Sequence, residues 1–183
     1  MESACYRGCV VRGRKNPLYM GVAARLKKAR REAGYNRQVV TQRAALADVT
    51  AVLGLEQGQR IPRLDTIERV AYALGLSPAF LAYGIEADAS PPTDGLRCEG
   101  VALRLRETRT AHGLNMRALA RAAGLTHTAV RSTETGASMP SIATVESFAV
   151  ALGVSPAWLA YGLGPMELPG RRRVAASPAA SPG

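Results

Sequence analysis

The stretch "LARAAGLTHTAVRSTETG", residues 119–136, carries the signals of two short helices joined by a tight turn. Gly124 can end the first helix in the left-handed conformation that glycine adopts freely, and Thr126 is a good N-cap for the second helix. The apolar residues converge on the turn with i, i+1, i+4 spacing; they are Leu119, Ala120, Ala123, Leu125 and Val130. We therefore expect helices at about 116–123 and 127–134, the second with an exposed polar side.

The residues around this stretch predict three more helices. One covers about 101–112 and another about 141–152. The phrase "LGVSPAWLAYG" at 152–162 predicts a short helix with Ser155 as its N-cap and Pro156 in its first position. No segment has the alternation of a strand, so the expected fold class is all-α.

The same pattern occurs twice in the chain. "LGLSPAFLAYG" at 74–84 is identical to "LGVSPAWLAYG" at 152–162 in nine of eleven positions, at an offset of 78 residues. Asn36 matches Asn115 at an offset of 79, so the first copy carries one extra residue between Asn36 and Thr50. Repetition at a fixed period indicates that one structural unit is present twice. We expect two tandem five-helix units joined by a linker that contains proline.

Shifts in composition predict the boundaries of these units. The Ser-Pro-Pro of "IEADASPPTDGLRCEG" is incompatible with a continuous helix, so residues 85–100 are predicted to form the linker. The two units then cover residues 21–84 and 101–165. Residues 1–20 are predicted to form a flexible N-terminal arm. The basic tail at 166–183 is rich in Pro, Ala and Ser and is predicted to be disordered.

The charge of the chain restricts its partners. Its 24 Lys and Arg residues exceed its 14 Asp and Glu residues, which gives a formal net charge of +10. Such a basic chain attracts polyanions, chiefly nucleic acid or an anionic membrane surface. The apolar runs are too short to span a membrane and no secretory signal is present, so we expect a cytoplasmic protein. Cys5, Cys9 and Cys98 lack metal-ligand spacing, which predicts neither a disulfide framework nor a zinc site.

Both copies resemble the helix-turn-helix domain of the Cro and lambda-repressor family, also called XRE-like. The second copy carries the resemblance in "LRLRETRTAHGLN", "LARAAGLTHTAVRSTETG" and "ALGVSPAWLAYG". The first copy carries it in "ARLKKARREAGYN", "VTAVLGLEQG" and "ALGLSPAFLAYG". The resemblance implies two tandem lambda-repressor-like domains that bind double-stranded DNA. The third helix of such a domain enters the major groove, where each base pair shows a distinct pattern of donors and acceptors.

The resemblance also implies which residues contact DNA. In the second copy the base-facing positions are Thr126, His127, Thr128, Arg131 and Ser132, and the phosphate contacts are Asn115 and Arg117. The recognition positions of the first copy are Asp48, Val49, Thr50, Leu53 and Gly54. Asp48 repels phosphate, and Val49 and Leu53 offer no hydrogen bonds to bases. The first copy nevertheless has ten basic against five acidic residues over 23–84, so we expect it to hold phosphate through Asn36, Arg25, Lys27, Lys28, Arg31, Arg37 and Arg43.

Two ion pairs are implied as structural elements by the same resemblance. Arg109 would pair with Glu134 in the second copy, and Arg30 with Glu56 in the first. Removing one partner of a buried pair leaves an uncompensated charge, so such pairs fix geometry.

The expected function is that of a sequence-specific DNA-binding transcription regulator, most simply a repressor. The second domain would read bases, and the first would supply phosphate contacts or a degenerate half-site, with the linker setting the spacing of the half-sites. A homodimer of whole chains is an alternative to this internal pairing. In a second interpretation the first domain presents Val49, Val52 and Leu53 to a protein partner, as in an antiactivator or an antitoxin-like binding module.

The sequence argues against an enzyme. It contains no glycine-rich phosphate loop, no nucleophile elbow and no zinc-binding His-Glu motif. His127 has no cysteine or acidic residue at metal-ligand spacing, so no metal is expected. No cofactor and no small-molecule ligand is evident either.

Overall fold

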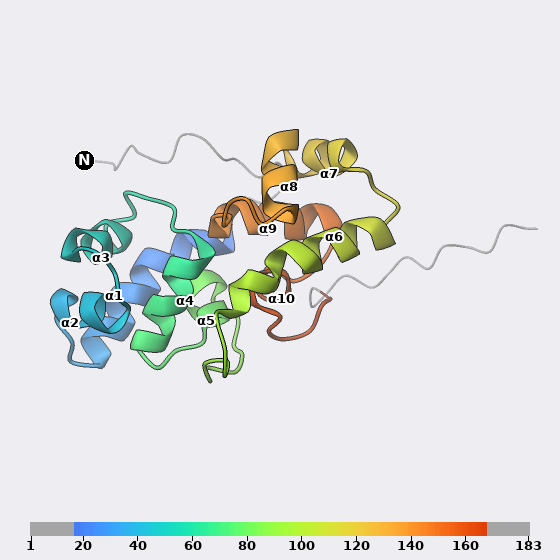
Figure 1. Cartoon of the computed structure of the whole chain (residues 1–183). Helices are drawn as coiled ribbons and strands as arrows, with labels where there is room; N and C mark the ends of the chain where they lie inside the picture. Colours follow the sequence, from blue (N-terminus) through green and yellow to red (C-terminus); the bar gives the residue numbers. More distant parts are fainter. Residues whose placement is uncertain (1–16, 168–183) are drawn as a thin grey trace, which may run out of the picture.

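All regular secondary structure in the part that the computed structural model describes, residues 17–167, is helical, and no strand occurs there (Figure 1). Residues 1–16 and 168–183, which include most of the expected arm and tail, lie outside this part. The 3₁₀ helices are η1 (Leu18–Gly21) and η2 (Arg97–Gly100). The α-helices are α1 (Val22–Glu32), α2 (Arg37–Arg43), α3 (Val49–Glu56), α4 (Leu64–Ala73), α5 (Pro78–Tyr83), α6 (Val101–Ala111), α7 (Met116–Ala123), α8 (His127–Glu134), α9 (Ile142–Leu152) and α10 (Pro156–Tyr161).

These elements fall into two sets with the same order. We call η1 to α5 (residues 18–84) the N-terminal half and η2 to α10 (residues 97–162) the C-terminal half. Side chains cap four helices in equivalent pairs, since an oxygen of each capping residue accepts a hydrogen bond from a free backbone N–H of the first turn. The caps are Asn36 and Asp48 in the N-terminal half and Asn115 and Thr126 in the C-terminal half. Ser155, expected as a cap, makes no capping hydrogen bond, although Pro156 does occupy the first turn of α10.

The turns between α2 and α3 and between α7 and α8 begin alike but differ in length. Gly124 has φ 66° and Ala45 has φ 49°. In the N-terminal half an alanine therefore adopts the left-handed conformation that a glycine adopts in the C-terminal half. The next amide folds back in both turns: Leu125 N–H donates to Ala120 O at 2.8 Å, and Leu46 N–H to Thr41 O at 3.0 Å. The extra residue of the first copy therefore lies between Leu46 and the cap Asp48.

The two halves meet along a seam at the start of α4 and α9. Arg63 and Ser141 form an isolated antiparallel bridge. On either side of it, Leu64 N–H donates to Pro140 O at 3.1 Å and Ile142 N–H donates to Pro62 O at 3.0 Å. Each contact is repeated with the halves exchanged, which is the pattern of a two-fold interface. The halves are thus related by an approximate two-fold axis within one chain.

Two fully buried carboxylates reinforce this seam. Glu146 of α9 accepts hydrogen bonds from the N–H groups of Leu18 (2.8 Å) and Tyr19 (3.0 Å) at the start of η1. Glu68 of α4 accepts the equivalent bonds from Arg97 (2.7 Å) and Cys98 (2.9 Å) at the start of η2. Each half therefore caps the first helical turn of the other, where unpaired N–H groups and the helix dipole favour a negative charge.

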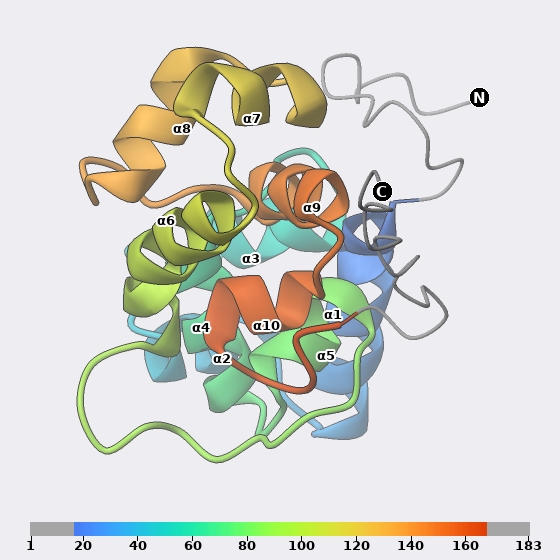
Figure 2. The same ribbon diagram turned by 90° about the vertical axis from the view of Figure 1, so that its right-hand side faces the viewer.

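The short helices α5 and α10 complete the contact between the halves. They pack on each other in the middle of the molecule, while α2 with α3 and α7 with α8 lie toward its two ends (Figures 1 and 2). The buried Tyr83 donates its hydroxyl to Ile142 O at 3.1 Å, and the buried Tyr161 lies 3.5 Å from Leu64 O. Buried apolar residues of both halves form one continuous core. Packing along the seam, and not the length of the linker, therefore sets the separation of the halves.

Three expected segment limits differ from the observed elements. Residues 18–20, assigned to the arm, belong to η1, where Tyr19 is buried. Residues 97–100, assigned to the linker, form η2, where Cys98 is buried and burial raises the pKa of its thiol. Met166, assigned to the tail, accepts the Ser155 N–H at 2.7 Å. In each of these segments an apolar side chain or a backbone group contacts the seam or α10. Such contacts with distant residues cannot be predicted from local composition.

The left-handed Ala45 generates a prediction about stability. Ala45→Gly should increase the free energy of unfolding by about 0.5–1 kcal/mol, because the strain of an L side chain at positive φ exceeds the entropy that glycine adds to the unfolded chain. Gly124→Ala is the matched reverse change and should decrease it by about 1 kcal/mol. Urea denaturation of the full chain measures both. A neutral or destabilising Ala45→Gly would contradict the prediction.

The carboxylate of Glu146 generates a second prediction. Glu146→Gln should destabilise the fold by about 2–3 kcal/mol, because an amide group can accept only one of the two backbone N–H groups and its NH₂ then faces the other. Glu68→Gln should have a similar effect. The control is Glu32→Gln, whose exposed pair with Lys28 should be worth at most about 0.5 kcal/mol. Equal unfolding midpoints for Glu146→Gln and Glu32→Gln would show that the buried carboxylate does not stabilise the seam.

Candidate nucleic-acid interface

The helix α8 has one buried and one exposed side. Val130, Thr133 and Glu134 are buried against the rest of the C-terminal half. The exposed residues are Thr126 at the cap, His127, Thr128 and Arg131. The side chains of His127, Thr128 and Arg131 make no hydrogen bond within residues 17–167. The side that the sequence predicted to be polar is therefore accessible, and no segment of residues 17–167 covers it.

Two of the predicted base-facing residues also have local structural roles. The Thr126 hydroxyl accepts the Ala129 N–H at 3.1 Å and thereby begins α8. Ser132 is half-buried, and its hydroxyl donates to Ala129 O at 3.3 Å. Among the predicted set, His127, Thr128 and Arg131 are thus the side chains most free to meet a partner.

The helix α7 lies beside α8 and adds exposed basic residues. Asn115 accepts the Ala118 N–H at 2.8 Å, so it positions the first turn of α7. Arg117 is exposed on that turn. Arg121, which the sequence analysis did not select, is exposed one turn later and lies on the same face of α7, because residues four apart share a helix face. The spacing of four residues between Arg117 and Arg121 is visible in the sequence and would have predicted this shared face.

A buried ion pair holds α8 against α6. Arg109 Nε lies 2.5 Å from Glu134 Oε1, and Arg109 Nη2 lies 2.8 Å from Glu134 Oε2. Arg109 also donates to Leu114 O at 2.8 Å, and the hydrogen bond with Glu134 raises the pKa of its guanidinium. A forked pair of this kind has a single geometry. It therefore fixes the orientation in which α8 presents its exposed side.

The N-terminal half contains the equivalent ion pair with an added partner. Arg30 Nε lies 2.5 Å from Glu56 Oε1, and Arg37 Nε lies 2.7 Å from Glu56 Oε2. Hydrogen bonds from both guanidinium groups lower the pKa of Glu56 against the opposing effect of burial. Arg37, which was expected to hold phosphate, shares the Glu56 carboxylate with Arg30 and keeps 40% of its side chain exposed.

Two further basic residues of the N-terminal half, for which phosphate contacts were expected, also make hydrogen bonds within the fold. Arg25 donates to Leu81 O at 2.9 Å and to Leu18 O at 3.0 Å, so it ties α1 to α5 and η1. Arg104 does the same in the C-terminal half. Arg43 stacks over the Tyr35 ring at 4.7 Å and donates to the Tyr35 hydroxyl and to Ala73 O, which directs it toward α4. Spacing on a helix does not reveal which carbonyl groups a guanidinium reaches.

The recognition positions of α3 form a different surface from those of α8. Asp48 caps the helix, and its hydrogen bond from Thr50 N–H lowers the pKa of the carboxyl. Val49 is 41% exposed, and Thr50 is exposed beside it. Val52 is fully buried, so its expected contact with a protein partner is wrong, and Leu53 is half-buried. The exposed start of α3 therefore carries one acid, one hydroxyl and the apolar residues Val49 and Ala51.

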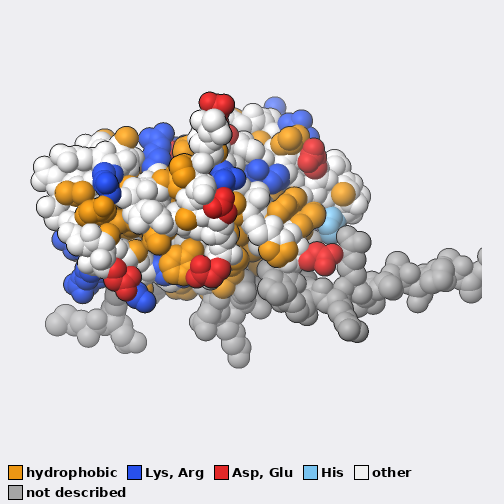
Figure 3. All heavy atoms as spheres, turned by 90° about the horizontal axis from the view of Figure 1, so that it is seen from below, with side chains coloured by type: hydrophobic (Ala, Val, Ile, Leu, Met, Phe, Trp, Pro, Cys, Tyr) orange, Lys and Arg blue, Asp and Glu red, His pale blue; other side chains and the backbone are white. Residues whose placement is uncertain are grey.

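Two other kinds of site on the described residues would involve a metal ion or a membrane. Side chains of both charges and hydrophobic side chains are interspersed on the face in Figure 3. No group of three or more His, Cys, Asp or Glu residues within 17–167 could hold a metal ion. In the same part of the chain, no helix has the length and apolar character needed to cross a membrane. The exposed Lys27, Lys28 and Arg31 lie on α1.

The comparisons with known proteins agree with the geometry of the C-terminal half. Residues 105–159 match the family model described as Helix-turn-helix. The match begins within α6 and ends within α10, so it includes α7, the turn at Gly124 and α8. Comparisons with curated proteins and with solved structures gave no match. Residues 105–159 are thus similar to helix-turn-helix domains, and the N-terminal half lies outside the matched segment.

Proposed function

We propose that the protein is a sequence-specific, double-stranded DNA-binding transcription regulator that acts in the cytoplasm as a repressor. The observation that carries this proposal is the exposed side of α8 within a helix-turn-helix segment. Thr126, His127, Thr128 and Arg131 occupy the start and middle of this helix and are accessible. A repressor of this kind acts by occupying its site and needs no catalytic group, cofactor or metal.

The base contacts belong to the C-terminal half. The major groove admits an α-helix, and the first residues of the recognition helix meet the base edges. In this arrangement Arg131 donates two hydrogen bonds to a guanine, and Thr128 contacts a thymine methyl or a polar base edge. Asn115 and Arg117 at the start of α7, together with Arg121, meet the phosphates beside the groove. His127 and Ser132 lie at the margins of the same contact.

The N-terminal half acts as a degenerate half-site in this proposal. We assign it to a second lambda-repressor-like domain, residues 21–84, in tandem with residues 101–165. The approximate two-fold relation gives α3 the place that α8 has in the other half, and in this proposal one duplex meets both helices. Thr50, Asn36, Arg37, Arg43 and the exposed Lys27, Lys28 and Arg31 supply the contacts there, whereas Arg25 is half-buried and binds carbonyl groups of the fold.

A protein-binding role is the second candidate for the N-terminal half. The specific observation in its favour is the exposed Val49 between Asp48 and Thr50, since Asp48 repels phosphate and valine cannot donate to a base. A partner protein, or a second copy of the chain, would cover this part of α3. The protein would then serve as an antiactivator or an antitoxin-like binding module.

Selection of bound fragments from random duplex DNA would first define the cognate site, and Arg131→Ala then tests the base contact. The substitution should weaken binding to that site by about 1–3 kcal/mol and relax the preference at one base pair. Binding to random DNA should change little. The matched control is Arg121→Ala on α7, which should weaken binding to cognate and to random DNA by the same factor. If Arg131→Ala weakens binding to cognate and to random DNA by the same factor, Arg131 contacts a phosphate and not a base.

Salt dependence distinguishes the two candidate functions. If DNA is the partner, log K should fall linearly with log of the salt concentration, because each neutralised phosphate releases counterions. Arg117→Ala should then reduce this slope by about one. Titrations of the full chain on labelled duplex between about 50 and 200 mM salt measure both quantities. No duplex binding even at low salt would exclude the DNA-binding proposal and leave the protein-binding candidate.

A further inference from the structure

The groups that join the two halves bond to each other within one chain. The N–H groups of Leu64 and Ile142 donate across the seam to Pro140 O and Pro62 O. The two buried carboxylates of α4 and α9 accept backbone N–H groups of the opposite half. These groups have their partners inside the molecule, so none of them is available to a second copy of the chain. We therefore expect a single chain to be the unit that meets a ligand.

The helices α3 and α8 occupy equivalent places on the same side of the molecule. A two-fold axis keeps related elements at the same level along its length, and here it relates α3 to α8 and α5 to α10. Both α3 and α8 lie above the contact between α5 and α10 in Figures 1 and 2. The segment between α5 and η2 runs mainly below that contact in Figure 2. The connection between the halves thus does not cover the side that carries α3 and α8.

The exposed side chains of α3 and α8 offer different groups to a base pair. His127 and Arg131 of α8 are matched by Val49 and Leu53 of α3. Both replacements are apolar, and Thr50 is the one side chain at the start of α3 that still has a hydrogen-bond donor. Hydrogen bonds are what distinguish base pairs in the major groove. The groups that can read a sequence are therefore concentrated in one half of a nearly symmetric frame.

Cationic residues beside α3 change in the opposite sense. Lys27 and Arg31 are exposed and share one face of α1, where α6 has Arg106 and Thr110. Arg106 donates to Glu134 O at 2.8 Å, at the end of α8. By the two-fold relation, the face of α1 that carries Lys27 lies beside α3. The N-terminal half thus has two cations where the C-terminal half has one.

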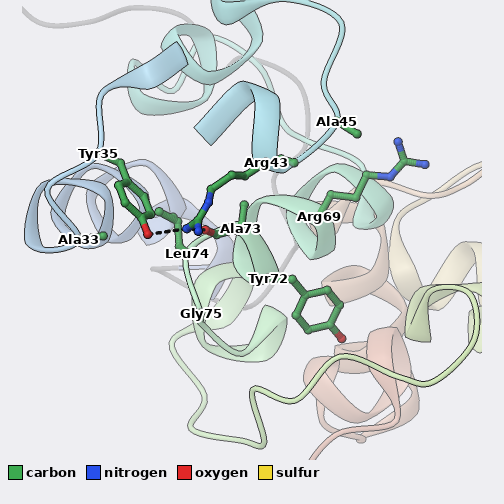
Figure 4. Close-up of a pocket in the computed structure, with 10 residues that line it drawn as sticks. Ala33, Tyr35, Arg43, Ala45, Arg69, Tyr72, Ala73, Leu74 and Gly75 are labelled. Carbon is green, nitrogen blue, oxygen red and sulfur yellow. Dashed lines mark hydrogen bonds between the residues drawn. The ribbon is translucent and has the colours of Figure 1, made fainter. Parts of the chain in front are cut away.

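Arg43 adds a further cation at the end of α2, where α7 has Ala122. Its guanidinium lies over the Tyr35 ring, and its Nη1 donates to the Tyr35 hydroxyl and to Ala73 O (Figure 4). The donors on Nε and Nη2 remain for another acceptor. These cations attract phosphate without regard to sequence.

The exposed positions of α2 keep groups that bind phosphate as well. Gln38 and Gln42 stand where α7 has Arg117 and Arg121. Glutamine side chains donate to phosphate oxygens, although they carry no charge. The N-terminal half has therefore lost donors for bases while it retains donors for the DNA backbone.

We propose that one chain binds one duplex in one orientation and reads the sequence under one half only, an inference that rests on the proposed binding of DNA. The side of α8 meets the base pairs that define the site. The N-terminal half holds the phosphates of the adjoining helical turn, about 10 bp away, whatever its sequence. The preferred DNA is thus a short asymmetric motif that needs additional duplex on one side.

Duplexes shortened on either side of the motif test this asymmetry. Selection from random duplex DNA should yield a single motif without inverted symmetry. Removal of about 10 bp from one side should weaken binding of the full chain at least tenfold, because the phosphate contacts of the N-terminal half are lost. Removal from the other side, or a changed sequence in the required flank, should alter the affinity by less than about twofold. Fluorescence anisotropy of labelled duplexes measures these affinities.

A duplex with two inverted copies of the motif, centred one helical turn apart, tests the stoichiometry. A single chain covers both copies, so sedimentation should show one chain per duplex. The affinity should rise by only about twofold, because two equivalent orientations double the association constant. Two chains that bind this duplex cooperatively would overturn the proposal.

Two variants separate the roles of the halves. Lys27→Gln with Arg31→Gln should reduce the effect of the required flank about threefold or more and leave the motif unchanged. A general loss of charge would weaken binding to long and shortened duplexes by the same factor, so the ratio of the two affinities is the readout. Arg131→Ala should do the reverse, with a weaker preference for the motif and an unchanged ratio.

The results that contradict this inference differ from those that contradict DNA binding itself. Equal losses on shortening either side, or a motif with inverted symmetry, would overturn the one-sided contact while binding to duplex DNA persists. An unchanged ratio for the variant of Lys27 and Arg31 would overturn the assignment of the flank to the N-terminal half. A chain that binds no duplex at low salt would overturn the proposed function and this inference together.

Discussion

The buried carboxylates of Glu68 and Glu146 are the constraint on which the rest of the structure depends. Each belongs to one half and binds two backbone N–H groups at the first helical turn of the other. A buried charge without such partners would cost several kcal/mol. The starts of η1 and η2 must therefore stay where these carboxylates lie. The apolar contacts of α5 with α10 then form around positions that are already specified.

The internal order of each half was predictable from local signals. Expected helices at 116–123 and 127–134 correspond to α7 and α8, because caps and the glycine at Gly124 are read from a few neighbouring residues. The partners Arg109 and Glu134 were inferred from a family resemblance, and the structure contains that pair. The exposed side of α8 was likewise predicted, because the spacing of the apolar residues places the polar ones on the opposite side of the helix.

The seam could not be predicted in the same way. It joins residues such as Tyr19 and Glu146, which are far apart in the sequence and share no periodic pattern. Arg25 shows the same difficulty at the level of one side chain. As a basic residue on a helix it is similar to Lys28, yet it is half-buried and its guanidinium binds carbonyl groups of η1 and α5. Only the packing of distant elements distinguishes a structural arginine from one that solvent or phosphate surrounds.

The seam within one chain also has a consequence for how the protein responds to its own abundance. Two separate subunits pair in proportion to the square of their concentration and come apart on dilution. Here the halves pair at every concentration, since the chain from α5 to η2 connects them. A surface built from both halves is therefore complete in a single molecule, and the fraction of molecules that carry it does not change when the cell holds only a few copies.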